Sequence, residues 1–400
     1  MQTKLLFFAC VFLVIIILLA LKRPLWQAIL GGIVLIVILY QIPPMEVLNC
    51  ITRVLTNRNS LFLIVSLYFI TYLQEMLNLR NLPSLVVEDL NHLFRSKRAN
   101  IISTAIFFGL LPSPAATIFC GDIVKESTGE YLDKYEQAFV TSWYRHIPES
   151  FMPTYSFILL FATLANVPIT EFIACMIVPV ILFILVGYYP YITKLPKASR
   201  DLVPSEKGKY LLPLLTHLWP ILLVLVLILA GGLSVIVAIL ISIVATGMVY
   251  RFKGKECTSL LTKAFHPSLI VNSFLCLLLK EFTSYVEVLE LLPDALSVLP
   301  IPTYMIFVLI FFIGGLFNST GIIAVGAPLA FSTLSGGAPL MMLLMCMCHM
   351  ANQLSPTHIC VVIAADHFGI SLGSLIRRIA PPALIFCVLA ILYYNLLILI

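Results

Sequence analysis

Two short segments of this 400-residue chain carry the side chains with the clearest potential for chemistry. The first contains Arg145, His146 and Glu149, and the second runs from His349 through Asn352–Thr357. A guanidinium can bind a carboxylate through two parallel hydrogen bonds, so Arg145 is the expected counter-charge for an anionic substrate. Glu149 follows one helical turn later. The alternative is therefore that Arg145 forms an internal ion pair with Glu149, which would close a gate.

An internal repeat relates the two segments. A shift of 203 residues aligns the segment that begins at Thr141 with the second half for more than forty residues without a gap, and places His146 on His349. Matched positions make these histidines candidates for a proton-carrying or substrate-binding role. A neutral histidine that hydrogen-bonds a backbone carbonyl is the favoured interpretation. A shift of 206 residues aligns Leu63 with Leu269 and Glu75 with Glu281 further upstream.

Small oxygen-bearing side chains gather where the apolar segments are interrupted. Hydroxyl and carbonyl oxygens are ligands for hard cations such as sodium. The predicted substrate-binding residues are Ser113, Arg145, His146, Asn318, Ser319, Thr320, Asn352, Ser355 and Thr357, and the predicted ion ligands are Asp122, Glu149, Thr154 and Gly321. Residues that merely complete a turn or cap a helix are the alternative for the Asn318–Gly321 segment and for Asp122.

No metal-binding or catalytic motif accompanies these residues in the sequence. The ten cysteines lack metal-like spacing, and Cys346-x-Cys348 is tighter than a CxxC pair, so we expect buried packing residues. HExxH and GxSG motifs are absent, which argues against an intramembrane enzyme. We therefore predict no catalytic residue, no metal and no cofactor, with sodium or a proton as the coupling ion.

The composition indicates that the solvent of this chain is a lipid bilayer. The chain is 61% hydrophobic and 11% charged, with a mean hydropathy of +1.06, whereas soluble domains carry roughly 25% charged residues. Apolar runs of about 20 residues, enough to span a membrane, recur along its length. The net charge of +5 is expected from basic loops at one leaflet and does not indicate nucleic-acid binding.

We predict an all-α polytopic membrane protein with ten spanning helices and two re-entrant hairpins. The expected spans are 5–21, 25–42, 60–79, 136–165, 169–190, 211–229, 232–250, 264–284, 338–366 and 372–398, with surface stretches at 83–94 and 286–298. The hairpins are expected at 101–118, with its tip at Pro112–Pro114, and at 303–333, with its tip at Asn318–Gly321, because these residues interrupt a helix.

The domain organisation follows from this count. Repeat one is 1–193, a cytoplasmic linker is 194–209, and repeat two is 210–400. Five crossings per repeat would invert the second repeat relative to the first. An N-terminus outside the cell puts nineteen of the 24 Lys and Arg residues on the cytoplasmic side, as the positive-inside rule requires. We therefore expect a plasma-membrane protein with both termini outside.

Three segments resemble a known family. Leu111–Pro114, Trp143–Ile147 and Ser355–Cys360 followed by Ala364–Asp366 are similar to an integral membrane family known as domain of unknown function 401. The resemblance covers essentially the whole chain. It implies the ion transporter superfamily, which includes sodium-coupled dicarboxylate and citrate carriers and sodium/proton antiporters. Carriers of the dicarboxylate branch bind carboxylate and sodium at hairpin motifs of Ser, Asn and Thr. Asn318–Thr320 has that composition in another order, and Pro112–Pro114 departs from the motif.

The expected function is secondary active transport of a small organic anion, a carboxylate by preference, coupled to sodium or protons through alternating access. The alternative is a cation/proton antiporter in which Asp122, His146 and Glu149 carry ions and Arg145 tunes their affinity. A passive channel and an intramembrane enzyme are weaker alternatives. The expected partners are the anionic substrate and the bilayer, and a homodimer is one expected assembly.

Overall fold

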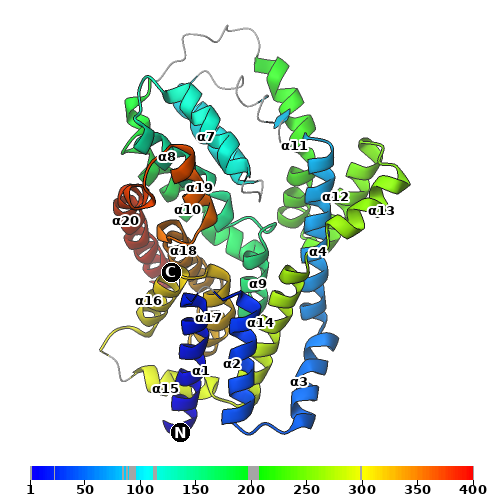
Figure 1. The fold of residues 1–400 in the computed structure, drawn as a ribbon, viewed down its shortest axis with the longest axis vertical. Helices are drawn as coiled ribbons and strands as arrows, with labels where there is room; N and C mark the ends of the chain where they lie inside the picture. Colours follow the sequence, from blue (N-terminus) through cyan, green and yellow to red (C-terminus); the bar gives the residue numbers. More distant parts are fainter. Residues whose placement is uncertain are drawn as a thin grey trace.

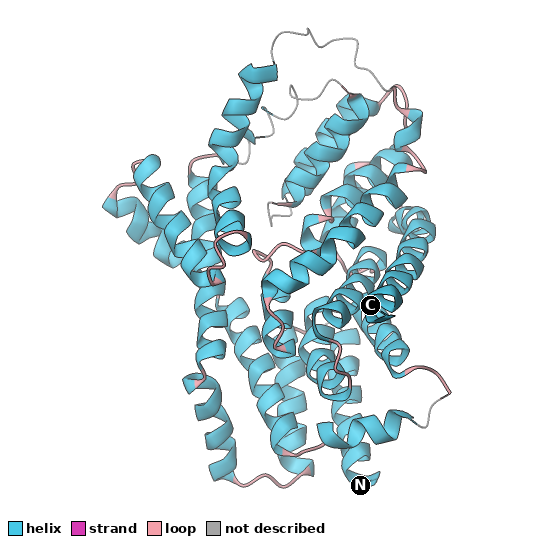
Figure 2. Cartoon of the chain, turned by 180° about the vertical axis from the view of Figure 1, so that it is seen from behind, coloured by secondary structure: helices cyan, strands magenta, loops and turns pink. Residues whose placement is uncertain are grey.

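The chain is helical throughout the part that a computed structural model describes, which comprises residues 2–21, 23–82, 85–86, 89, 96–110, 115–196, 207–297 and 300–399. Within these ranges there is no β-strand, and Figure 2 shows helices joined by loops. The predicted all-α class is confirmed. The expected tip at Pro112–Pro114 lies outside the described residues, as does most of 83–94.

The helices follow one another along the chain in two similar series (Figure 1). The first half contains α1 (Gln2–Ala20), α2 (Leu25–Leu39), α3 (Pro44–Thr56), α4 (Arg58–Leu79), α6 (Lys97–Gly109), α7 (Ala115–Thr128), α8 (Lys134–Arg145), η1 (Pro148–Ser150), α9 (Ser156–Ala165), α10 (Ile169–Tyr188) and η2 (Ile192–Lys194). The second half contains α11 (Lys207–Leu229), α12 (Val235–Val249), α13 (Gly254–Lys263), α14 (Pro267–Tyr285), η3 (Leu289–Leu291), α15 (Leu292–Ser297), α16 (Thr303–Gly315), α17 (Ser319–Thr333), α18 (Gly337–Leu354), α19 (Ile359–His367) and α20 (Leu372–Leu399). The amphipathic helices α3 and α13 were not predicted, because neither contains a long apolar run.

Helix boundaries recur between the two halves. α6 and α16 begin 206 residues apart, and each has 13 residues. The pairs α8 and α18, α9 and α19, and α10 and α20 each begin 203 residues apart. These are the offsets at which the sequence aligns with itself. Each half therefore contains the same order of a helix pair, an interrupted helix and a long apolar helix.

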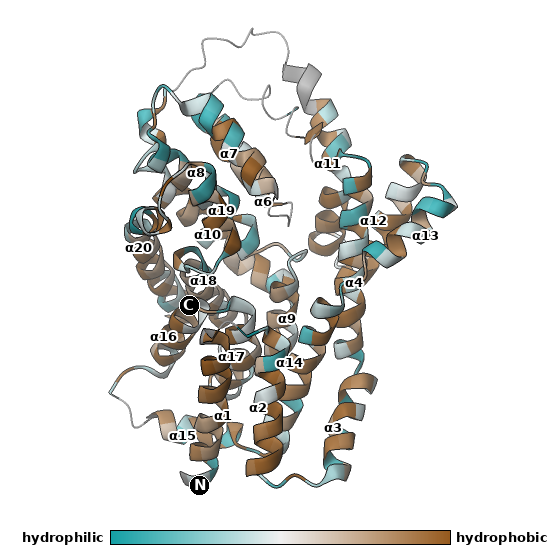
Figure 3. Ribbon diagram, in the orientation of Figure 1, coloured by the Kyte–Doolittle hydropathy of each residue, from teal (hydrophilic) through white to brown (hydrophobic). Residues whose placement is uncertain are grey.

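The hydropathy of the helices is compatible with a membrane protein. Within the described residues, α4, α10, α20 and the Leu212–Leu229 part of α11 are long and apolar enough to cross a membrane, and α13 with α14, bent by 53°, would make a fifth span. Ile177, Ile181 and Leu185 on α10 are 59%, 50% and 53% exposed, so one face of this helix presents an apolar stripe to the surroundings. Figure 3 shows hydrophobic residues along most of α1, α2 and α16, with polar residues concentrated near the ends of α7, α8 and α13.

The other expected spans take shorter forms. α1, α2, α9, α12, α16 and α17 are apolar helices of 10–17 residues by the same measure. The expected spans 136–165 and 338–366 are each divided into two helices, α8 and α9 in the first and α18 and α19 in the second. Proline explains both divisions: Pro148 and Pro153 follow α8, Pro356 follows α18, and proline cannot donate the hydrogen bond that a continuing helix needs.

Candidate functional site

The first interrupted helix buries an ion pair. Arg145 is the last residue of α8, and its Nη1 lies 3.1 Å from Oε1 of Glu149 in η1. The two side chains are only 1% and 7% exposed. Burial of a charge is tolerated where the charge is paired, so the i,i+4 pair explains how both residues occupy the interior. The internal pair considered from the sequence is therefore present.

Each interrupted helix is in close contact with the helix pair of its own half. A Cβ atom on Gly109, at the end of α6, would lie 1.9 Å from the carbonyl oxygen of Arg145. A Cβ atom on Gly315, at the end of α16, would lie 3.0 Å from the carbonyl oxygen of Cys348. Gly315 is 206 residues after Gly109, and Cys348 is 203 residues after Arg145. The same glycine contact therefore occurs in both halves, and only glycine permits so close a backbone approach.

Hydrogen bonds reinforce these contacts at both interruptions. The hydroxyl of Tyr155, which follows the first interruption, donates to the carbonyl of Gly109 over 2.5 Å. In the second half, the hydroxyl of Ser355 donates to the carbonyl of Leu316 over 2.6 Å and pairs with the Thr357 hydroxyl at 2.8 Å. The carbonyl groups of Gly109, at the end of α6, and of Leu316, just after α16, are thus satisfied by side chains of the interrupted helix of the same half.

The predicted tip at Asn318 is the turn between α16 and α17. Oδ1 of Asn318 accepts a hydrogen bond from the Gly321 amide over 2.7 Å, so Asn318 caps α17. A Cβ on Gly326 would lie 2.7 Å from Phe311, and one on Gly314 would lie 2.5 Å from Ile322. Since residues at similar sequence distances before and after Asn318 meet across the two helices, the chain reverses direction there.

Three histidines meet between the two interruptions. Nε2 of His146 lies 2.9 Å from Nε2 of His358, which is the residue just before α19. Nδ1 of His146 lies 2.5 Å from the carbonyl oxygen of Ser142, so this nitrogen is the donor and carries the ring proton. The His349 ring, on α18, has its centre 6.4 Å from that of His146. Both histidine roles considered from the sequence are compatible with this arrangement, since His146 bonds a backbone carbonyl and also faces a second titratable ring.

Glu149 and Cys360 complete a compact group with two of these histidines. The ligand atoms of His146, Glu149, His358 and Cys360 all lie within 4.8 Å of one another, and three of the four residues are buried. Contacts link α8 with α19, which lie near each other in Figure 1, and so bring the two halves of the group together. Neither His358 nor Cys360 was predicted to lie near Arg145, because 212 residues separate His146 from His358.

Several buried polar atoms around the interruptions have no hydrogen-bond partner within the described part of the protein. They are Oγ of Ser142, Oγ1 of Thr154, Oγ of Ser319, Nε2 of His349, and both amide atoms of Gln353. The Gln353 side chain is 0% exposed, although glutamine is rarely placed fully inside a protein. Buried polar groups nearly always form a hydrogen bond with protein, water or a ligand. These atoms therefore mark a region that could bind a polar ligand. Gln353 was not among the predicted residues.

The remaining predicted residues occupy different places. Thr320 lies in the first turn of α17 and Asn352 in the last turn of α18, and both are half-buried. The side chain of Asp122 on α7 is 62% exposed and lies 3.4 Å from Nε2 of His367, away from the buried group. Ser113 is outside the described residues. The structure thus brings Arg145, His146 and Glu149 together, and places Ser355 and Thr357 against the Leu316 and Phe317 carbonyls just before Asn318.

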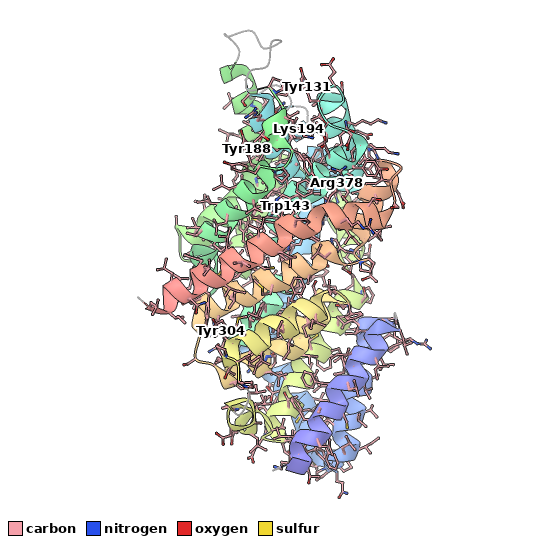
Figure 4. All side chains as sticks on the ribbon, turned by 90° about the vertical axis from the view of Figure 1, so that its left-hand side faces the viewer. Tyr131, Trp143, Tyr188, Lys194, Tyr304 and Arg378 are labelled. Atoms are coloured by element: carbon pink, nitrogen blue, oxygen red, sulfur yellow. The ribbon has the colours of Figure 1, made fainter. Side chains whose placement is uncertain are left out.

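Charged residues form ion pairs around the start of α8, and two of them, Lys194 and Arg378, are labelled in Figure 4. Nζ of Lys194 pairs with Glu136, and Arg378 of α20 lies 3.6 Å from Asp133 and 3.9 Å from Glu136. Figure 4 places Lys194 and Arg378 near each other, with Trp143 close by and further along α8. These ion pairs tie the start of α8 to α20 and to the segment after α10.

The family model described as "Protein of unknown function (DUF401)" matches residues 5–397, which is nearly the whole chain. No curated protein matches the chain.

Proposed function

The chain belongs to the DUF401 family of proteins of unknown function, and we propose that it is a secondary active transporter that moves a small organic anion across the plasma membrane. The carboxylate class is preferred for the substrate, with a proton or a sodium ion as the coupling ion. Two inverted repeats of the ion transporter type, each with five spans and one re-entrant hairpin and with both termini outside, form the proposed framework.

One observation carries this proposal: an interrupted helix occurs at matched positions of both halves, and each interruption meets the glycine end of a neighbouring helix. Non-helical backbone within an apolar bundle is tolerated where it is enclosed by protein or faces an aqueous cavity. In transporters built from inverted repeats, such breaks hold the substrate and the coupling ions. The recurring Gly109 and Gly315 contacts and the unpartnered polar atoms of Ser319, His349 and Gln353 support this comparison.

The Arg145–Glu149 pair supports a way to couple substrate and proton. While Glu149 is ionised, its Oε1 pairs with Nη1 of Arg145 at 3.1 Å, and the guanidinium is not available to a substrate. When Glu149 takes up a proton, the ion pair is lost and Arg145 can bind a substrate carboxylate instead. Substrate and proton would then enter together, and the net charge of the site would stay the same. His146 lies beside the pair and is the expected neighbour for relaying the proton.

A cation/proton antiporter remains the second candidate, and the same ion pair favours it. An antiporter needs a buried carboxylate that exchanges a proton for a cation, and Glu149 is buried. In that mechanism Arg145 would stay paired with Glu149 in one state and never contact a substrate carboxylate. Asp122 is unsuited to this role because its side chain is largely exposed.

Uptake into proteoliposomes tests the proposal. Radiolabelled mono-, di- and tricarboxylates are offered under an inward proton gradient, an inward sodium gradient, or neither. We expect at least one carboxylate to accumulate, Arg145→Lys to lose most of the uptake because a point charge cannot replace a planar fork, and Glu149→Gln to lose the dependence on the proton gradient. Arg53→Ala, at an exposed position of α3, is the matched control and should transport normally. Proton efflux driven by sodium, lithium or potassium without any carboxylate would instead establish the antiporter.

A further inference from the structure

We propose that His146, Glu149, His358 and Cys360 form a binding site for one divalent transition-metal ion of the zinc class, and that this ion links the two interrupted helices. The inference goes beyond the proposed transport function. It rests on the contacts of these side chains, concerns the state in which Glu149 is ionised, and holds whether or not the protein carries carboxylates.

The donor set selects the class of ion. Two imidazoles, one carboxylate and one thiolate are the ligands that Zn²⁺ and Co²⁺ prefer, whereas Na⁺, Mg²⁺ and Ca²⁺ prefer oxygen ligands alone. The four ligand atoms lie within 4.8 Å of one another. Around a tetrahedral zinc ion, ligand atoms at about 2.0–2.3 Å from the metal would lie roughly 3.3–3.8 Å apart. The widest pair therefore needs to close by about 1 Å, which side-chain rotation can supply.

The orientation of His146 provides a separate argument. Its Nδ1 donates to the carbonyl of Ser142 over 2.5 Å, which leaves a lone pair on Nε2. A metal-binding histidine is usually held in this way, with its other ring nitrogen on a carbonyl or carboxylate. The lone pair points toward Nε2 of His358, 2.9 Å away. At 2.9 Å this contact has the length of an N–H···N hydrogen bond. With the His358 proton on its Nδ1, both Nε2 lone pairs can bind one ion once the two nitrogens move apart to about 3.3 Å, their separation around a tetrahedral ion.

The charges of the site also accommodate the ion. Arg145 contributes one positive charge, and Glu149 contributes one negative charge beside it at 3.1 Å. Metal binding converts the Cys360 thiol to a thiolate and releases one proton to solvent, so M²⁺ and the thiolate add a single net charge to the site. A carboxylate has enough lone pairs to accept from Arg145 and to bind the metal at the same time.

The location of the ligands gives the ion a structural consequence. His146 and Glu149 belong to the interruption of the first half, whereas His358 and Cys360 flank the start of α19 in the second half. An ion held by all four crosslinks segments that are more than 200 residues apart in the sequence. It would stabilise the conformation seen here relative to any state in which the two interruptions separate.

Cobalt spectroscopy on the purified full-length protein tests the site directly. Protein stripped with a chelator is titrated with Co²⁺, and the near-ultraviolet band of a cobalt–thiolate bond is recorded together with the intense visible bands of a tetrahedral ion. We expect one Co²⁺ per chain, displaced by Zn²⁺, and a higher midpoint of thermal unfolding with Zn²⁺ than with Mg²⁺. We expect Cys360→Ser to abolish the thiolate band and His358→Ala to weaken binding by at least about 100-fold, the upper range for losing even a partner outside the coordination sphere.

Matched variants separate the site from general effects of mutation. Cys276→Ser removes another fully buried cysteine, on α14, and His266→Ala removes an exposed histidine. Both should retain the wild-type cobalt spectrum. Wild-type protein that shows no thiolate band would overturn the proposal even if a variant fails to fold, and so would full binding by Cys360→Ser and His358→Ala. Since no substrate is present, these outcomes are independent of the transport assay.

Discussion

Removal of Arg145 should destabilise the protein mainly through the charge that it leaves behind. The guanidinium is 1% exposed, and its partner Glu149 is 7% exposed at 3.1 Å. Arg145→Ala deletes the counter-charge while Glu149 stays in a site without access to bulk water. Breaking a buried ion pair in this way costs about 3–5 kcal/mol. Replacing both partners with apolar residues of similar size removes the unpaired charge, so Arg145→Met combined with Glu149→Leu should cost far less than Arg145→Ala.

Thermal unfolding in detergent, followed by tryptophan fluorescence, measures this difference. The chain has three tryptophans, and Trp143 is fully buried two residues before Arg145, so it reports on the interruption itself. At about 1.2 °C per kcal/mol for a 400-residue chain, Arg145→Ala should lower the unfolding midpoint by roughly 4–6 °C. The Met/Leu double variant should recover most of that loss while remaining inactive in transport.

Two results would refute this account of the ion pair. One is an unchanged midpoint for Arg145→Ala, which would mean that Glu149 finds another partner or reaches water. The other is a Met/Leu double variant as unstable as the single variant, which would assign the loss to packing. Arg378→Ala serves as the control, because this arginine is 31% exposed and lies 3.6 Å from Asp133, so its loss should cost about 1 kcal/mol or less.

Further predictions concern the contacts between the helix pairs and the interruptions. Gly109→Ala should destabilise the protein by more than about 1–3 kcal/mol, the range for an overpacked core. The reason is that the added Cβ would lie 1.9 Å from the Arg145 carbonyl oxygen. Gly373→Ala in α20, where a Cβ meets nothing within 4 Å, should be neutral or slightly stabilising in the same unfolding assay. Equal midpoints for the two variants would contradict the close contact. Ser355→Ala removes the hydrogen bond to the Leu316 carbonyl and should cost roughly 1–3 kcal/mol, because that acceptor loses its donor. Ser259→Ala, at an exposed position of α13, should change the free energy of unfolding by less than about 0.5 kcal/mol.

Much of the local structure was determined by the sequence alone. Proline removes a backbone donor and disfavours a helical residue before it, which agrees with the ends of α8 and α18 shortly before Pro148 and Pro356. Proline alone does not end a helix here, since Pro179 lies inside α10. Asn318 is a strong capping residue before an apolar run, which explains the start of α17. The Arg145–Glu149 pair is likewise local, since residues four apart in a helical segment are neighbours. The all-α class follows from the long apolar runs.

Only the tertiary structure decided which of these local features meet. The group of His146, His358 and Cys360 depends on packing between α8 and α19, and no spacing pattern in one segment encodes the distance to another segment 212 residues away. The need for glycine at Gly109 comes from a neighbouring carbonyl rather than from its own backbone angles. Asp122, predicted as an ion ligand with a helix cap as the alternative, lies exposed beside His367, because the direction in which a side chain points depends on the orientation that its helix adopts in the packed bundle.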